Sequence, residues 1–192
     1  MITDFRPRNL SGSLEYDSSD RIARLNLPAD ARLQQLARGI ESAMAEGSRT
    51  AVEHACRDFL AETSSFFNVT APAVRVLGAR PVRIYEAGIG ELFGDYQINK
   101  AVIRVWMRTA VQLKVTSFGT LLNTLCHEFC HHLDIRLFNF PHSYHTRGFY
   151  ARIAALYHHC RGTPVVPLVW RRMPQNRWRI DWGRMRRLRG NG

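Results

Sequence analysis

The stretch CHEFCHH at residues 126–132 constrains this chain more than any other feature. It places His127 and His131 four residues apart, with Glu128 directly after the first histidine. On an α-helix, four residues at about 100° each nearly close one turn, so both imidazoles lie on the same face. We therefore expect a helix that presents two imidazoles and a carboxylate together.

The residues on either side of the motif continue a helical pattern. Placed by helical angle from His127, the side chains divide into an apolar side and a polar side. The apolar side holds Leu121, Leu122, Leu125, Cys126, Phe129, Leu133 and Leu137. The polar side holds Asn123, Thr124, His127, Glu128, Cys130, His131 and Asp134. This division weighs against an interpretation in which the motif histidines are only buried core residues.

This combination of residue types suits a metal ion. Neutral imidazole is a good ligand for zinc, and a carboxylate one residue along the helix can lie beside the ion without binding it. Glu128 can then accept a proton from a water molecule on the ion. We therefore predict a Zn²⁺ site with His127 and His131 as ligands and Glu128 as the catalytic base.

A catalytic zinc ion usually has three protein ligands and one position open to water, so a third ligand is needed. Because Glu128 is the last glutamate of the chain, the downstream candidates are Asp134 and the later histidines. We favour His145, in the polar loop FPHSYHTRG, because the helix expected after this loop can anchor it by burying Phe149. His142, three residues earlier, is the competing candidate.

Other polar groups near the motif have simpler explanations. Asp134 lies on the polar side but about 10 Å along the helix axis from His127, which fits a hydrogen-bond acceptor behind the ligands better than a ligand. His132 points toward the core and is expected to be structural. His158 and His159 come near the end of an expected helix, where an imidazolium is favourable for ordinary reasons.

The remaining patterns predict an α+β fold. Two amphipathic helices are expected between residues 28 and 60, separated by Gly47. Strand-like segments occupy residues 72–107, and we expect them to form a small, mostly antiparallel sheet. A helix beginning near Thr120 carries the histidine motif against this sheet, and a further helix begins near Arg147.

The two ends of the chain differ from the middle, which we predict to be one domain at residues 28–170. Residues 1–27 are rich in Ser, Asp and Arg without sustained periodicity, so we expect a flexible or loosely docked lead-in. The tail, residues 171–192, holds eight arginines against Asp181 and contributes much of the net charge of +11. Its alternating tryptophans and arginines predict a basic hairpin, and the final stretch, GRMRRLRGNG, is expected to be disordered.

Cysteine spacing and hydropathy narrow the class of protein further. Cys56, Cys126, Cys130 and Cys160 form no CxxC pair, so neither a disulfide scaffold nor a zinc ribbon is indicated. The sequence has neither an apolar run long enough to span a membrane nor an apolar signal segment at its start. We expect a cytoplasmic protein without membrane contact, and the sequence leaves its oligomeric state open.

Three sequence elements occur here in a recognisable order. The first is GDYQINKAVIRV, with Gly94, Tyr96 and Ile103; the second is CHEFCHHLD; the third is His145 with Phe149, an H-x-x-x-F element. Together they resemble the SprT-like zincin metallopeptidases, which are similar to the WLM peptidases. The resemblance covers roughly residues 92–157.

This resemblance implies a zincin-like fold with an active-site helix and a bound zinc ion. It implies that His127, His131 and His145 bind the zinc and that Glu128 is the base. Members of the group often carry a C-terminal zinc ribbon or another DNA-binding element, and here a tail rich in Trp and Arg stands in that place.

The sequence therefore predicts a zinc-dependent metallopeptidase whose substrates are proteins or peptides, including nucleic-acid-associated proteins. An extended peptide would bind along the sheet edge, antiparallel to a strand in residues 92–107, with Tyr144 and Tyr150 as candidate oxyanion donors. The alternative is a nucleic-acid-binding protein in which zinc only steadies the fold. In that case the arginines of the tail neutralise phosphates and its tryptophans stack on bases. Hydrolysis of a non-peptide amide would use the same metal chemistry.

Overall fold

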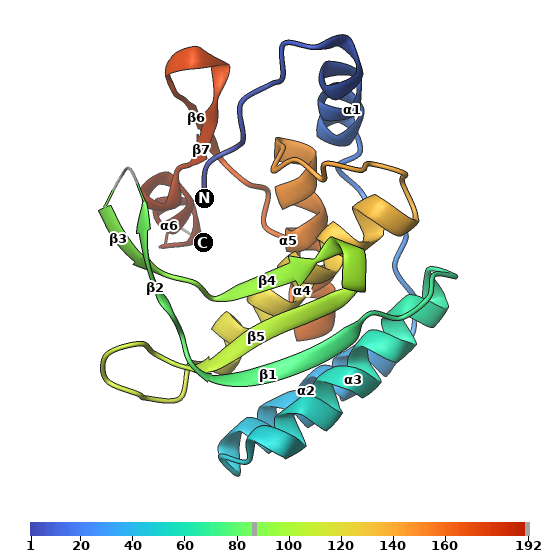
Figure 1. Ribbon diagram of the computed structural model, residues 1–192, viewed down its shortest axis with the longest axis vertical. Coiled ribbons are helices and arrows are strands. Elements are labelled where there is room, and N and C mark those ends of the chain that lie inside the picture. Colours follow the sequence, from blue (N-terminus) through green and yellow to red (C-terminus); the bar gives the residue numbers. More distant parts are fainter. Residues whose placement is uncertain (86–87, 191–192) are drawn as a thin grey trace.

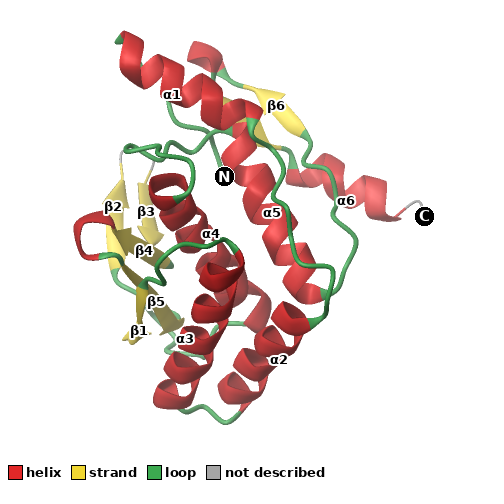
Figure 2. Cartoon of the chain, turned by 90° about the vertical axis from the view of Figure 1, so that its right-hand side faces the viewer, coloured by secondary structure: helices red, strands yellow, loops and turns green. Residues whose placement is uncertain are grey.

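A three-stranded sheet forms one wall of the protein, and helices cover one of its faces (Figures 1 and 2). The computed structural model describes residues 1–85 and 88–190. Within the sheet, β5 (Val102–Arg108) lies between β1 (Ala73–Ala79) and β4 (Gly94–Gln97). The α+β class expected from the sequence is confirmed. No helix in the described part of the chain is long and apolar enough to cross a lipid bilayer.

The pairing within the sheet differs from the mostly antiparallel arrangement that we expected. β4 is antiparallel to β5, but β1 is parallel to β5. Between them the chain forms a separate hairpin of β2 (Val82–Tyr85) and β3 (Gly88–Glu91), and a 3-10 turn at Ile98–Lys100 joins β4 to β5. The alternation of residues marks strands but not their neighbours, so this parallel pairing was not readable from the pattern.

One face of the sheet is buried and the other is polar. Val74 and Val76 of β1 and Ile103 and Val105 of β5 are at most 5% exposed. Arg104, between the last two, lies on the opposite face because successive side chains of a strand alternate, and it pairs there with an aspartate of β4. The helices therefore cover a single apolar face.

The helices on this face follow the sequence prediction closely. α2 (Arg32–Ala45) and α3 (Arg49–Phe66) form a helical hairpin, and the Ser48 side chain caps α3 by accepting a backbone hydrogen bond in its first turn. α3 packs on β1, and α2 packs against α4 (Phe118–Arg136) and α5 (Arg147–Arg161). α4, the helix with the histidine motif, lies against β4 and β5.

The N-terminal segment is not the loose lead-in that we expected, because it contains the helix α1 (Leu10–Arg21). Its pattern is inverted relative to an ordinary amphipathic helix: Leu10 and Leu14 are 75% and 57% exposed. The buried positions carry small or polar residues, which conceal the helix from a hydrophobic pattern. These buried residues are Gly12, Ser13, Tyr16 and Ser19.

Contact between α1 and α5 depends on a glycine. A Cβ atom at Gly148 would lie 2.2 Å from the backbone oxygen of Ser19, closer than atoms approach in proteins. The absence of a side chain at Gly148 therefore lets α1 pack directly on the start of α5 (Figure 1).

The C-terminal tail packs on the same core and ends in a helix that we did not expect. β6 (Trp170–Arg172) and β7 (Trp178–Ile180) form the predicted hairpin around a 3-10 turn. α6 (Trp182–Gly190) follows, where the sequence suggested disorder. The Asp181 side chain accepts a backbone hydrogen bond from its first turn and Met185 is buried, so a cap and one apolar contact stabilise this Arg-rich helix. The last two residues of the expected disordered stretch lie outside the described residues.

We predict that a buried ion pair between α4 and α5 contributes strongly to stability. The side chains of Arg152 and Asp134 are both 0% exposed, with Nη2 and Oδ1 2.7 Å apart. Because Arg152→Ala would leave a buried carboxylate without its cation, we expect the free energy of unfolding to fall by about 3 to 5 kcal/mol in chemical denaturation. Arg32→Ala, which breaks an exposed pair with Glu62, is the control and should change little. Equal effects of the two substitutions would contradict this view.

Candidate metal centre

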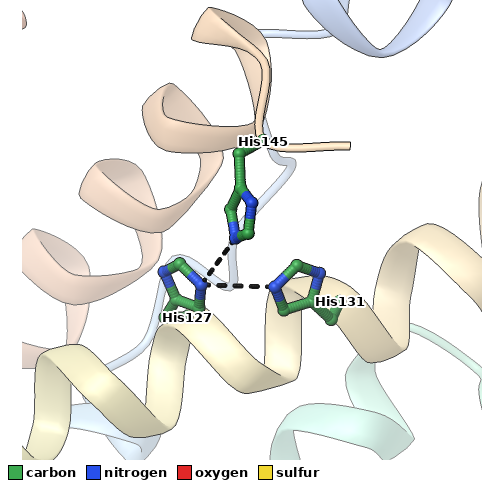
Figure 3. A group of neighbouring side chains, drawn as sticks. All are labelled: His127, His131 and His145. Atoms are coloured by element: carbon green, nitrogen blue, oxygen red, sulfur yellow. Dashed lines mark hydrogen bonds between the residues drawn. The ribbon is translucent and has the colours of Figure 1, made fainter. Parts of the chain in front are cut away.

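Three histidine side chains converge on one point above α4 (Figure 3). His127 and His131 come from α4, and His145 comes from the loop before α5. The Nε2 atom of His127 lies 3.1 Å from Nε2 of His145 and 3.2 Å from Nε2 of His131. In the part of the chain that the structure describes, this is the only group of three or more His, Cys, Asp or Glu residues that could hold a metal ion.

The spacing of these nitrogens is close to that of a tetrahedral zinc site. Zinc binds imidazole nitrogen at about 2.0 to 2.1 Å, which places two ligands of a tetrahedron about 3.3 Å apart. The two separations of 3.1 and 3.2 Å are near this value. The ligand atoms of the three histidines all lie within 4.8 Å of one another, so these residues could hold a metal ion.

The protonation of His131 follows from its hydrogen bonds. Its Nδ1 lies 2.7 Å from Oγ of Ser143, and that hydroxyl donates its own proton to Asp134 at 3.0 Å. Since the hydroxyl proton is already used, Nδ1 of His131 must be the donor in the first bond. A neutral imidazole carries one proton, so Nε2 of His131 presents a bare lone pair to the centre.

A hydrogen bond to Asp4 likewise fixes a proton on the outer nitrogen of His145. Its Nδ1 lies 3.3 Å from the Asp4 carboxylate, which can only accept, so Nδ1 carries a proton; in the neutral ring Nε2 is then bare. Asp4 also accepts the backbone N–H of His145 at 2.9 Å. Asp4 therefore fixes both the position and the proton of the third imidazole, as carboxylates do for histidine ligands of zinc.

Burial favours the neutral forms of His127 and His131. It lowers the pKa of His127 to about 3, with the neighbouring His145 adding to the effect. Burial likewise lowers the pKa of His131, and both neighbouring imidazoles contribute. A neutral His127 can donate from Nε2 to at most one of the two bare nitrogens, so lone pairs face one another in this cluster. A cation between them removes that repulsion.

Phe149 forms an apolar floor under all three imidazoles. Its ring centroid lies 5.2 Å from that of His127, 4.5 Å from His131 and 5.1 Å from His145. The side chain is fully buried in the first turn of α5. Phe149 follows His145 by four residues. The residue that anchors the loop on α5 therefore also packs against the three imidazoles.

Glu128 lies beside the histidines where the edge strand β4 crosses α4. A Cβ atom at Gly94 would lie 2.5 Å from Cγ2 of Thr124 and 3.0 Å from Oε1 of Glu128. Glycine is thus required for the strand backbone to approach the carboxyl group. Burial raises the pKa of Glu128 to about 8, with Asp95 contributing. Glu128 and His127 both line a cleft of about 1150 Å³.

The other histidines lie where the sequence analysis placed them. His142 pairs with Glu15 and does not join the cluster, whereas His145 does, so His145 is the better placed of the two candidates for the third position. His132 is a buried structural residue, bonded to the Tyr96 hydroxyl and to a backbone carbonyl. Asp134 is not part of the cluster and accepts hydrogen bonds from Ser143 and Arg152.

One expectation about the surroundings of the motif needs correction. Cys130 and Asp134, which we placed on the polar side of the helix, are 0% exposed, because α5 and the N-terminal segment cover that side too. The Tyr150 hydroxyl donates to the backbone carbonyl of Ile2, and Tyr144 stacks on His142. Neither tyrosine hydroxyl is hydrogen-bonded to the histidine cluster.

Sequence reasoning missed the acidic residues that hold the ligand loop. Glu15 accepts the backbone N–H groups of His142 and Ser143, and Asp20 accepts that of Arg147. With Asp4, these carboxylates fix the loop from the N-terminal side. They are more than 120 residues away in sequence from their partners, so the only signal was an excess of acids near the N-terminus.

We predict that His145 and not His142 is required for metal binding. His145→Ala should abolish tight binding of Zn²⁺, measured by calorimetry, because two imidazoles on one helix remain. His142→Ala removes a histidine of the same loop without touching the cluster and should bind as the unmodified protein does. The reverse pattern would show that the loop rearranges around the ion.

We also predict that Asp4 strengthens metal binding from outside the ligand set. Asp4→Ala should weaken zinc affinity about 10- to 100-fold, because the His145 imidazole then loses the hydrogen bond that orients it and holds its proton on Nδ1. Asp17→Ala is a matched control, since this exposed aspartate of α1 pairs only with Arg6. Titration against a zinc chelator measures both, and equal affinities would rule out a role for the N-terminal segment.

Comparison with known protein families, with curated proteins and with solved structures found no match for this chain. The resemblance to the SprT-like group therefore rests on the three sequence elements alone.

Proposed function

We propose that this protein is a zinc-dependent metallopeptidase with a zincin-like active site of the SprT-like kind. The observation that supports this most is the convergence of ring nitrogens from three imidazoles beside a buried carboxyl group that lines a cleft. The ligands His127, His131 and His145 and the base Glu128 are those that the sequence motifs suggest.

The number of ligands favours a catalytic over a structural zinc ion. A structural site is usually closed by four protein ligands, whereas a catalytic site keeps one position for water. Among the described residues, no fourth His, Cys, Asp or Glu joins the cluster. All four cysteines are free and buried, and none belongs to the cluster.

The environment of Glu128 suits a group that takes up a proton during the reaction. Zinc held by the three imidazoles would polarise the scissile carbonyl and lower the pKa of a water molecule at the open position. Glu128 would accept a proton from that water molecule, and burial favours the neutral form that results. It then donates that proton to the leaving amine.

The edge of the sheet offers a place for an extended peptide. β4 is an edge strand, and the carbonyl of Phe93 accepts a hydrogen bond from Trp106 of β5. Hydrogen-bonding direction alternates along an antiparallel strand, so the N–H and C=O groups of Gly94 and Tyr96 face away from β5. A substrate strand pairing with these groups would pass directly beside Glu128.

A second candidate function is nucleic-acid binding, with zinc in a supporting role. The tail carries exposed arginines on the β6–β7 hairpin and on α6, which could neutralise phosphates. The tryptophans are less available: Trp178 lies under the Arg147 guanidinium and Trp170 packs against Tyr150. Base stacking by these two residues is therefore not favoured, whereas Trp182 is 46% exposed and remains a candidate for stacking.

The proposed peptidase activity predicts a specific outcome for Glu128→Gln. This variant should still bind one zinc ion, because the three imidazoles are unchanged, but should lose about 10²- to 10⁴-fold in kcat on an unstructured protein substrate such as casein. Zinc content and proteolysis should be measured on the same preparation.

The Glu91→Gln variant is a suitable control, because Glu91 lines the cleft but pairs with Arg80. It should keep zinc and most activity. Full activity of the zinc-loaded Glu128→Gln variant would contradict the assigned role of the carboxylate.

A further inference from the structure

A long cleft extends from the histidine cluster between α5 and the C-terminal segment. Its volume is about 1150 Å³, and it begins at His127 and Glu128. Pockets for small ligands usually measure about 300 to 1,000 Å³, so this cleft is larger than one amino-acid side chain needs.

The length of the cleft follows from the residues of α5 that line it. They run from Tyr150, next to the histidines, to Arg161 at the end of the helix. Eleven residues at 1.5 Å each correspond to about 16 Å. An extended chain of about five residues spans that distance.

The walls of the cleft are mostly apolar. Ile153, Ala154 and Tyr157 of α5 form one side, and Leu168, Trp182 and Met185 of the C-terminal segment form the other. This second wall includes α6, the helix that the sequence did not reveal. The C-terminal segment thus shapes the site as well as carrying charge.

The charged residues that line the cleft include Glu91, Glu128, Arg161 and Met1, which carries the N-terminal ammonium group. Glu91 at the mouth pairs with Arg80, and the Arg161 guanidinium at the far end lies 5.2 Å from the ring of Phe118. A charged side chain would have to leave water for the apolar middle of the cleft, whereas an apolar one gains about 25 cal/mol for each Å² buried there.

One amide group in the cleft favours a peptide over a plain hydrocarbon chain. Asn123 lies one helical turn before His127 and lines the cleft. In the described part of the chain its side chain makes no hydrogen bond, while the neighbouring Thr124 hydroxyl is bonded to the backbone of α4. The Asn123 amide can therefore bind a backbone N–H or C=O of a substrate, which a hydrocarbon chain does not offer.

We propose that this cleft binds an apolar stretch of about five residues on one side of the scissile bond, so that the substrates are exposed hydrophobic segments of proteins. This inference rests on the proposed peptidase function and adds its substrate class. The apolar residues pack between α5 and α6, and Asn123 holds the backbone near the histidine cluster.

Cleavage of matched peptides tests the preference. Two quenched peptides of equal length share the residues at the scissile bond, and one carries Leu, Val and Phe where the other carries Ser, Gln and Gly. We expect kcat/KM for the zinc-loaded protein to be at least tenfold higher for the apolar peptide. Ala154→Phe, which fills the cleft, should remove this advantage.

A control on the same helix separates a filled cleft from a disturbed fold. Ala151→Phe lies on α5 but does not line the cleft, so the preference should remain. If Ala154→Phe fails to fold, Ala154→Leu provides a smaller obstruction. Equal cleavage of the two peptides by the unmodified protein would overturn the inference while leaving the peptidase function intact.

Binding without catalysis distinguishes the two proposals. Calorimetry should show that the Glu128→Gln protein binds the apolar peptide at least tenfold more tightly than the polar one. Adding Ala154→Phe or Asn123→Leu should weaken the binding of the apolar peptide. Such binding without cleavage by the unmodified protein would contradict the peptidase and support the cleft. A fatty-acyl amide that binds more tightly than the peptide, with no effect of Asn123→Leu, would overturn the assignment of a peptide.

Discussion

The mutual repulsion of imidazole lone pairs is the constraint around which the site is arranged. Hydrogen bonds to Ser143 and Asp4 place the protons of His131 and His145 on their outer nitrogens. Both inner nitrogens then face Nε2 of His127 at little more than 3 Å, and burial favours the neutral forms of His127 and His131. An arrangement of this kind is favourable when a cation lies between the rings, and the proposed function follows from it.

Residues from segments far apart in the chain hold the histidines in this arrangement. Asp134 accepts from Ser143 and from Arg152, and Arg152 also donates to the backbone of Ser19 in α1. The ligand loop includes Ser143 with a φ of 47°, a conformation that is unusual for a residue with a side chain. Buried polar groups thus link α1, α4 and α5, and they help to position His131 and His145.

Sequence patterns were informative where structure is local and uninformative where it depends on distant packing. The four-residue spacing of the motif, the cap at Ser48 and the alternation in the tail predicted α4, α3 and the β6–β7 hairpin. α1 was missed because its buried side consists of small and polar residues.

In the site, too, the residues set by local structure were predictable from the sequence, and those set by distant packing were not. His127, His131 and Glu128 follow from helix geometry, and the loop position of His145 made it the better of two candidates. Asp4 could not be found in this way, because its role depends on where the N-terminus docks. The cleft was also hidden, since one wall belongs to a helix whose Arg-rich sequence suggested disorder.

X-ray absorption spectroscopy of the zinc-loaded protein tests the central claim most directly. The account predicts one zinc ion per chain with three imidazole nitrogens at about 2.0 to 2.1 Å and one oxygen from solvent. A zinc ion with a sulfur ligand or four protein nitrogens, or a protein that binds no zinc, would contradict it.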